Sequence, residues 1–80
     1  MTTTYFAKLS LKEKIDLLSD DATYLMSRQN FLYNIFLYGV RDLYVEVWYL
    51  RKTNQLQDIE VITSNKAMEL YLNKMNLEFV

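Results

Sequence analysis

Two glutamates beside the tryptophan are the side chains best suited to chemistry. Glu46 and Glu60 fall in neighbouring predicted strands, on the same sheet face as Trp48. Two carboxylates so placed can perform acid–base work, or bind a hard cation together with further oxygen ligands. Solvated acids at a sheet edge are far commoner, so the pattern favours a structural interpretation.

The composition excludes most other catalytic chemistry. The 80 residues include no histidine and no cysteine, which removes the usual general base, disulfides and most zinc sites. The single glycine, Gly39, cannot build a phosphate-binding loop. The adjacent acids Asp20 and Asp21 point about 100° apart on a helix and suit a solvated face. We therefore expect no catalytic residue, metal or cofactor, and an enzyme is not favoured.

Charge argues against nucleic-acid binding. Nine basic and ten acidic side chains give a net charge of −1, which supplies no field to attract a polyanion. Tyr44 and Trp48 could stack on bases, but such platforms lie among basic residues, whereas Glu46, Asp58 and Glu60 surround these rings.

The apolar runs of the chain are short. The longest, Phe31 to Val40, is about ten residues, roughly half of what a membrane-spanning helix needs. The start, Met1 to Ser10, lacks the basic and apolar regions of a signal peptide. The sequence predicts no membrane association and a cytoplasmic location.

A long helix is predicted to begin after Ser10. Ser10 and Glu13 match a capping box, in which each side chain accepts a hydrogen bond from the other residue's backbone amide. Behind it one apolar stripe runs at helical spacing to a helix end near Arg28; it comprises Leu11, Ile15, Leu18, Ala22 and Leu25.

Three strands and a second helix follow. The strands are predicted over Phe31–Tyr38, Leu43–Leu50 and Gln57–Thr63, because these runs are rich in branched and aromatic residues or alternate in polarity. Ser64 can cap a helix that reaches about Asn76. The fold class is α+β in a single domain, residues 1–80: a long N-terminal helix packed on a three-stranded antiparallel meander, then a short C-terminal helix (α-β-β-β-α).

Strand parity and charge predict how the three strands pair. Pairing Glu46 with Ile62, Trp48 with Glu60 and Val47 with Val61 avoids placing Glu46 opposite Glu60. A bend centred on Gly39 to Arg41, with Gly39 supplying a positive φ, would pair Phe36 with Tyr44. Odd-numbered residues then form a core face under the long helix; they are Tyr33, Ile35, Leu37, Leu43, Val45, Val47, Tyr49, Ile59 and Val61.

The even-numbered face is too apolar to remain bare. Its exposed patch would exceed what monomers usually leave uncovered, so it is the candidate interface. The interface residues are Leu32, Phe36, Tyr38, Tyr44, Trp48 and Leu50. Three coverings remain open: the C-terminal helix, a second copy in a homodimer, or another protein or ligand. The function expected is a small protein-interaction or assembly module that self-associates, and the alternative is a ligand-binding or enzymatic domain using Glu46 and Glu60 beside Trp48.

The chain also carries a resemblance. The run Leu43 to Tyr49, the segment Ile59-Glu60-Val61, the helix Lys66 to Leu72 and the start Leu9 to Lys14 resemble a small family of short, uncharacterised bacterial proteins of the Bacteroidetes type. The resemblance implies an intracellular, stand-alone domain of unknown function and assigns no catalytic or binding residue.

Overall fold

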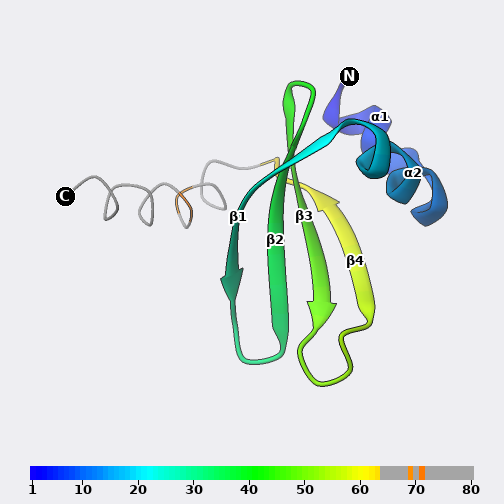
Figure 1. Cartoon of the computed structure of the whole chain (residues 1–80). Helices are drawn as coiled ribbons and strands as arrows, with labels where there is room; N and C mark the ends of the chain where they lie inside the picture. Colours follow the sequence, from blue (N-terminus) through cyan, green and yellow to red (C-terminus); the bar gives the residue numbers. More distant parts are fainter. Residues whose placement is uncertain (64–68, 70, 72–80) are drawn as a thin grey trace.

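The computed structural model describes residues 1–63, Glu69 and Tyr71, and shows two short helices followed by an antiparallel meander (Figure 1). The sheet order is β1-β2-β3-β4. This confirms the predicted α+β class, but the sheet has four strands instead of three. The elements are α1 (Thr3–Lys8), α2 (Leu11–Asp21), β1 (Ala22–Gln29), β2 (Tyr33–Val40), β3 (Leu43–Leu50) and β4 (Leu56–Val61).

Both helices begin at side-chain caps. The capping box is confirmed, because the Ser10 hydroxyl accepts from the Glu13 amide at 3.1 Å and the Glu13 carboxylate accepts from the Ser10 amide at 3.0 Å. The bond from the Ser10 backbone, and then the Ser10 hydroxyl, lower the pKa of Glu13. Helix α1 was not predicted, although Thr2 caps it by accepting from the Tyr5 amide at 3.0 Å.

The prediction of one long helix to Arg28 was wrong. Helix α2 ends at Asp21, and the next eight residues form β1. The β1–β2 register shifts between Tyr24 and Met26, and this bulge interrupts the two-residue alternation that marks a strand. The three-residue spacing of Ala22 and Leu25 therefore matched the period of a helix.

Asn30 makes the turn that returns β1 onto β2. Its side-chain oxygen accepts hydrogen bonds from the amides of Leu32, at 3.0 Å, and Tyr33, at 2.8 Å. An asparagine that binds amides two and three residues ahead mimics a backbone turn. This was the available signal for the missed strand.

The predicted pairing of the central strands was also wrong. Phe36 lies opposite Val47 instead of Tyr44, and the β2–β3 connection consists of Arg41 and Asp42. Gly39 lies within β2 without a positive φ, whereas Arg41 has φ of 56°. The tight two-residue connection reverses the parity of β2, so every β2 side chain lies on the opposite face from the one predicted.

The β3–β4 register differs from the prediction by two residues. Glu46 lies opposite Glu60, and Trp48 lies opposite Asp58. The three predicted pairs are therefore wrong: Trp48 with Glu60, Val47 with Val61, and Glu46 with Ile62. The like charges are tolerated because Arg28 neutralises Glu46, a contact that pairwise strand reasoning did not include.

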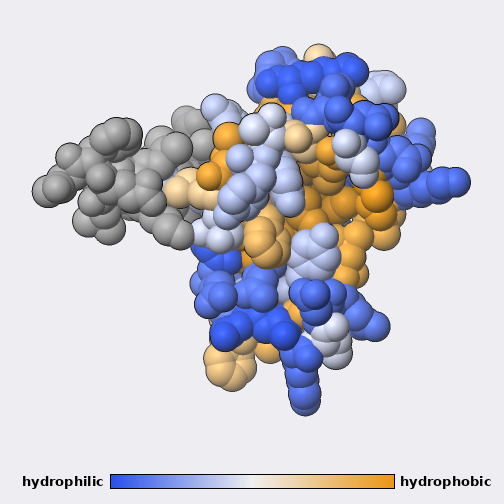
Figure 2. All heavy atoms as spheres, in the orientation of Figure 1, coloured by the Kyte–Doolittle hydropathy of each residue, from blue (hydrophilic) through white to orange (hydrophobic). Residues whose placement is uncertain are grey.

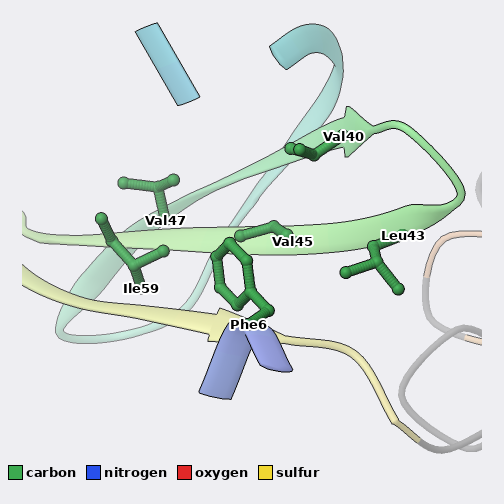
Figure 3. Packing of buried hydrophobic residues seen from close by; sticks show 6 residues of the cluster. All are labelled: Phe6, Val40, Leu43, Val45, Val47 and Ile59. Carbon is green, nitrogen blue, oxygen red and sulfur yellow. The ribbon is translucent and has the colours of Figure 1, made fainter. Parts of the chain in front are cut away.

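The core lies between the helices and one sheet face (Figure 3). Phe6 of α1 packs there against sheet residues, and the buried cluster is Phe6, Val40, Leu43, Val45, Val47 and Ile59. The placement of Val45 and Val47 toward the helices is confirmed. The predicted core stripe on α2 is only half buried, because Leu11 and Ile15 are 49% and 39% exposed, while Leu17 and Leu18 pack on the core.

The opposite sheet face also holds buried residues. Ile35 and Leu37 are buried there because the parity of β2 is reversed, and Tyr33 lies on the same face. The predicted helix Ser64–Asn76 lies outside the described residues except for Glu69 and Tyr71, which are helical. Tyr71 is buried against this second face, where its hydroxyl donates to Glu46.

Candidate functional site

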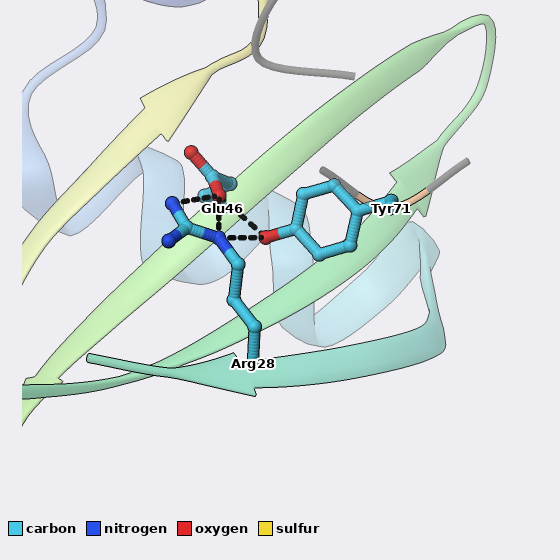
Figure 4. A network of polar contacts seen from close by, with 3 residues as sticks. All are labelled: Arg28, Glu46 and Tyr71. Carbon is cyan, nitrogen blue, oxygen red and sulfur yellow. Dashed lines mark hydrogen bonds and ion pairs between the residues drawn. The ribbon is translucent and has the colours of Figure 1, made fainter. Parts of the chain in front are cut away.

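A buried polar cluster occupies the face of the sheet that carries Trp48 (Figure 4). Arg28 of β1 reaches across β2 and donates from Nε and Nη2 to one oxygen of Glu46, at 3.2 and 3.0 Å. The Tyr71 hydroxyl donates to the same oxygen and accepts from Arg28 Nε at 3.1 Å. The three side chains thus form a closed network.

The network is shielded and its charges are balanced. Glu46 is 6% exposed and Tyr71 is 1% exposed. The Arg28 guanidinium carbon lies 5.4 Å from the centre of the Trp48 ring and 5.7 Å from that of Tyr71, so both rings favour the cation. Burial, and then the bond to Glu46, raise the pKa of Tyr71, which keeps its proton. One oxygen of Glu46 is therefore already engaged by Arg28 and Tyr71.

Glu60 has a different environment from Glu46, although the two residues lie opposite each other. Its hydrogen bond with Asp58 is the largest cause that raises the pKa of Glu60, followed by burial and by the charges of Asp58 and Glu46. A depression of about 260 Å³ opens beside it, lined by Tyr33, Trp48, Gln57, Asp58 and Glu60. Within the described residues, no group of three or more acidic side chains is arranged to hold a metal ion.

The structure divides the predicted interface between both faces of the sheet. Tyr44, Trp48 and Leu50 share the face of Glu46. Phe36 and Tyr38 lie on the helix side, opposite Val47 and Val45. Leu32 lies in the β1–β2 turn and is 54% exposed. These six residues do not form one contact surface.

The helix side instead holds an apolar groove between α2 and the sheet. Figure 2 shows its hydrophobic surface below the polar surface of the helices. The groove measures about 290 Å³ and is lined by Ile15, Leu18, Ser19, Tyr38, Val47, Tyr49, Leu56 and Ile59.

An aromatic row continues from the groove; we define it as Tyr24, Phe36, Tyr38 and Tyr49. Ring centres are 5.8 Å apart for Tyr24 and Tyr38, 6.3 Å for Tyr24 and Phe36, and 5.6 Å for Phe36 and Tyr49. Burial raises the pKa of Tyr38, and the neighbouring Tyr49 and Tyr24 raise it further. Tyr24 is 53% exposed, so the row reaches the surface.

The short second helix explains why this surface is uncovered. At 1.5 Å per residue, the 11 residues of α2 span about 16 Å, whereas an eight-residue strand spans about 27 Å. Arg41 in the β2–β3 connection binds Asp21 at 3.1 Å, which holds the helix at that end of the sheet. The aromatic row begins near this end, with Tyr24 opposite Tyr38, and continues along the face through Phe36 to Tyr49. Sequence reasoning missed the row because it placed Tyr24 in a helix, and Phe36 and Tyr38 on the opposite face of the sheet.

Comparisons with known proteins add no functional assignment. No family model matches the chain, and searches of curated proteins and of solved structures gave no significant match. Among the described residues, no helix has the length and hydropathy needed to cross a bilayer.

Proposed function

We propose that the chain is a small protein-interaction or assembly module that self-associates as a homodimer through the apolar groove and the aromatic row. The observation that carries the proposal is the exposed apolar surface on the helix side. Leu11, Ile15 and Tyr24 are each 39% to 53% exposed there, beside the half-buried Tyr38 and Tyr49.

The apolar character of this surface supports a binding role, because monomers leave few large apolar patches uncovered. Covering exposed apolar area contributes about 25 cal/mol per Å² before the costs of association. The aromatic side chains in it offer large contact area at a low cost in conformational entropy.

The alternative site at Glu46 and Glu60 has weaker support. Arg28 and Tyr71 already occupy one oxygen of Glu46, which is 6% exposed, so this carboxylate is not open to a substrate. The proposal therefore includes no catalytic role. A cytoplasmic location and membership of the bacterial family that the sequence resembles belong to the same proposal. An unidentified protein is the alternative occupant of the groove.

Sedimentation equilibrium of the full chain tests the proposal. We expect the average mass to rise with concentration between about 10 and about 500 µM, as for a weak dimer. Ile15→Glu places a charge in the groove and should give a monomer throughout. The matched control is Phe31→Glu, because Phe31 is 91% exposed in the β1–β2 turn, away from the groove.

Two results would reject the proposed self-association. One is a wild-type chain that remains monomeric at the highest concentration. The other is an equal loss of association in Ile15→Glu and Phe31→Glu, because this would show that any added charge, and not the groove, changes the mass.

A further inference from the structure

A cavity between α1 and α2 takes no part in the proposed function. Figure 1 shows the two helices side by side at one end of the sheet. The cavity measures about 540 Å³ and shares no lining residue with the apolar groove. Its volume is within the roughly 300–1,000 Å³ of sites that bind small molecules. Three apolar side chains line it and also pack against the core, so this wall is held in place; they are Met1, Leu9 and Leu17.

Three carboxylates form another side of the cavity. Glu13, Asp16 and Asp20 line it together, because residues three, four and seven apart lie on one side of a helix. Among the described residues, the side chains of Asp16 and Asp20 have no ion-pair or hydrogen-bond partner. The capping box, first through the Ser10 backbone amide, lowers the pKa of Glu13, so this carboxylate also stays charged.

The cationic groups of the cavity wall already have partners. Arg41 lines the cavity but binds Asp21 at 3.1 Å. The terminal ammonium group of Met1 lies 3.5 Å from a carboxylate oxygen of Asp42. The free carboxylates of α2 therefore leave the cavity with negative charge that its own wall does not neutralise. Charge complementarity favours a cationic ligand there.

The arrangement suits an extended cation better than a metal ion. Asp16 and Asp20 are one helical turn apart, about 6 Å along the axis. No acidic group of the described residues converges in the way that a metal ion requires. A linear polyamine carries separate ammonium groups, each of which can meet a different carboxylate, while the methylene groups between them lie on the apolar wall. The ring of Tyr5, which is 58% exposed in the same cavity, offers a further contact to an ammonium group.

We propose that the cavity between α1 and α2 binds a linear aliphatic polyamine, with its ammonium groups at the Asp16 and Asp20 carboxylates and its methylene chain on Leu9 and Leu17. Because the carboxylates are exposed, their ion pairs are weak and are screened by salt. We expect a Kd of about 0.1 mM at low ionic strength, which weakens about tenfold in about 0.5 M salt.

Isothermal titration calorimetry of the full chain with spermidine tests the proposal. We expect Asp16→Asn and Asp20→Asn each to weaken binding about fivefold, and the double variant D16N/D20N to abolish it. Tyr5→Ala should weaken binding about threefold, because it removes the aromatic contact. The matched control is Glu60→Gln, which removes the same charge from a residue that does not line the cavity and should bind like the wild type. Circular dichroism of each variant establishes that the helices are retained.

Two further probes distinguish a polyamine from other cations. Magnesium chloride supplies a compact cation, and a tri-lysine peptide supplies the same ammonium groups on a polypeptide. We expect both to bind at least about tenfold more weakly than spermidine. Equal binding of magnesium would identify a metal site, and tighter binding of the peptide would identify a protein partner; either result would overturn the proposal.

Two other results would also overturn it. One is the absence of spermidine binding to the wild type at about 1 mM. The other is an equal loss of binding in Glu60→Gln and Asp16→Asn, because this would show a general attraction to the net charge. The proposal does not depend on self-association: a wild-type chain that is monomeric at every concentration rejects the homodimer and leaves the cavity untouched, and a chain that dimerises without binding spermidine does the reverse.

Discussion

Glu46 shows why an acidic residue can occupy the middle of this sheet. It is 6% exposed and lies opposite another glutamate, an arrangement that costs free energy when neither charge is compensated. Arg28 and the Tyr71 hydroxyl satisfy the carboxylate, and the Trp48 ring lies over the arginine. The network also links β1, β3 and residue 71, so a single carboxylate connects three distant parts of the sequence.

Removing the arginine should be more damaging than neutralising the pair. In Arg28→Met the hydrocarbon part of the side chain is retained, but Glu46 keeps a buried charge without a counter-ion. We expect a loss of about 3 kcal/mol in the free energy of unfolding. The double variant R28M/E46Q should recover more than half of it, because a neutral glutamine still accepts from Tyr71. Urea denaturation measures both, and equal losses in the two variants would contradict this account.

Glu60 should make stability depend on pH. Its pKa is raised above the ordinary 4.5 in the folded chain, first by the hydrogen bond with Asp58, so the folded state binds more protons than the unfolded state. The free energy of unfolding therefore falls as pH rises through 4.5 and into the window above it. Because Glu60 is largely exposed, solvent screening keeps the effect small.

Glu60→Gln removes this titration and can still bond to Asp58. We expect the melting temperature of the variant to exceed that of the wild type by about 1–2 °C at pH 7 and to match it near pH 4. Thermal melts at a series of pH values provide the comparison, with Asp20→Asn as a control for net charge, because Asp20 is exposed on α2. A difference that is constant across the series would exclude the titration of Glu60 as its cause.

The edge strands show how elements are kept from pairing with other chains. The Ile59 amide of β4 donates to the Asp58 side chain at 2.8 Å, and Lys14 of α2 donates to the Ile59 carbonyl at 3.3 Å. These side chains occupy backbone groups at the edge that another strand could otherwise bind. In β1 the bulge between Tyr24 and Met26 interrupts the edge instead.

The turn between β1 and β2 depends on one side chain. Asn30→Ala leaves the amides of Leu32 and Tyr33 without their side-chain acceptor. We expect a loss of about 1 kcal/mol in the free energy of unfolding, which is typical of an exposed capping residue. Chemical denaturation measures it. Asn54→Ala is not a suitable control because Asn54 has φ of 58°, so Gln29→Ala is used. An unchanged stability in Asn30→Ala would mean that water replaces the side chain without cost.

Elements with one clear period were predictable from the sequence, and those with interrupted patterns were not. The strand Leu43–Leu50 has the predicted bounds because its alternation is unbroken. Strand β1 was missed because the bulge hides its alternation, and α1 is too short for periodicity to show. The face of β2 depended on a two-residue connection at Arg41, where an arginine with positive φ gives no compositional signal. The aromatic row could not be predicted from the sequence, because this required both the fourth strand and the correct parity of β2.

At the scale of the whole molecule, both faces of the sheet carry buried residues although the chain is small. Phe6 and the central valines form the core on the helix side, while Ile35, Leu37 and Tyr71 are buried on the other. A chain of 80 residues hides a smaller fraction of its surface than a large one does, so its margin of stability is narrow. Each large buried side chain therefore carries much of that margin.

Phe6→Ala should unfold a substantial fraction of the protein. Phe6 is fully buried, and its removal leaves a cavity between α1, β3 and β4, for which we expect a loss of about 3–5 kcal/mol. That loss approaches the 5–15 kcal/mol total typical of native proteins. Tyr5→Ala is the matched control, since Tyr5 is 58% exposed on the same helix and should cost less than about 1 kcal/mol. Equal stability of the two variants in urea would show that α1 is dispensable for the core. A large difference would establish that residues 3–8 stabilise the sheet, although the sequence pattern does not reveal this helix.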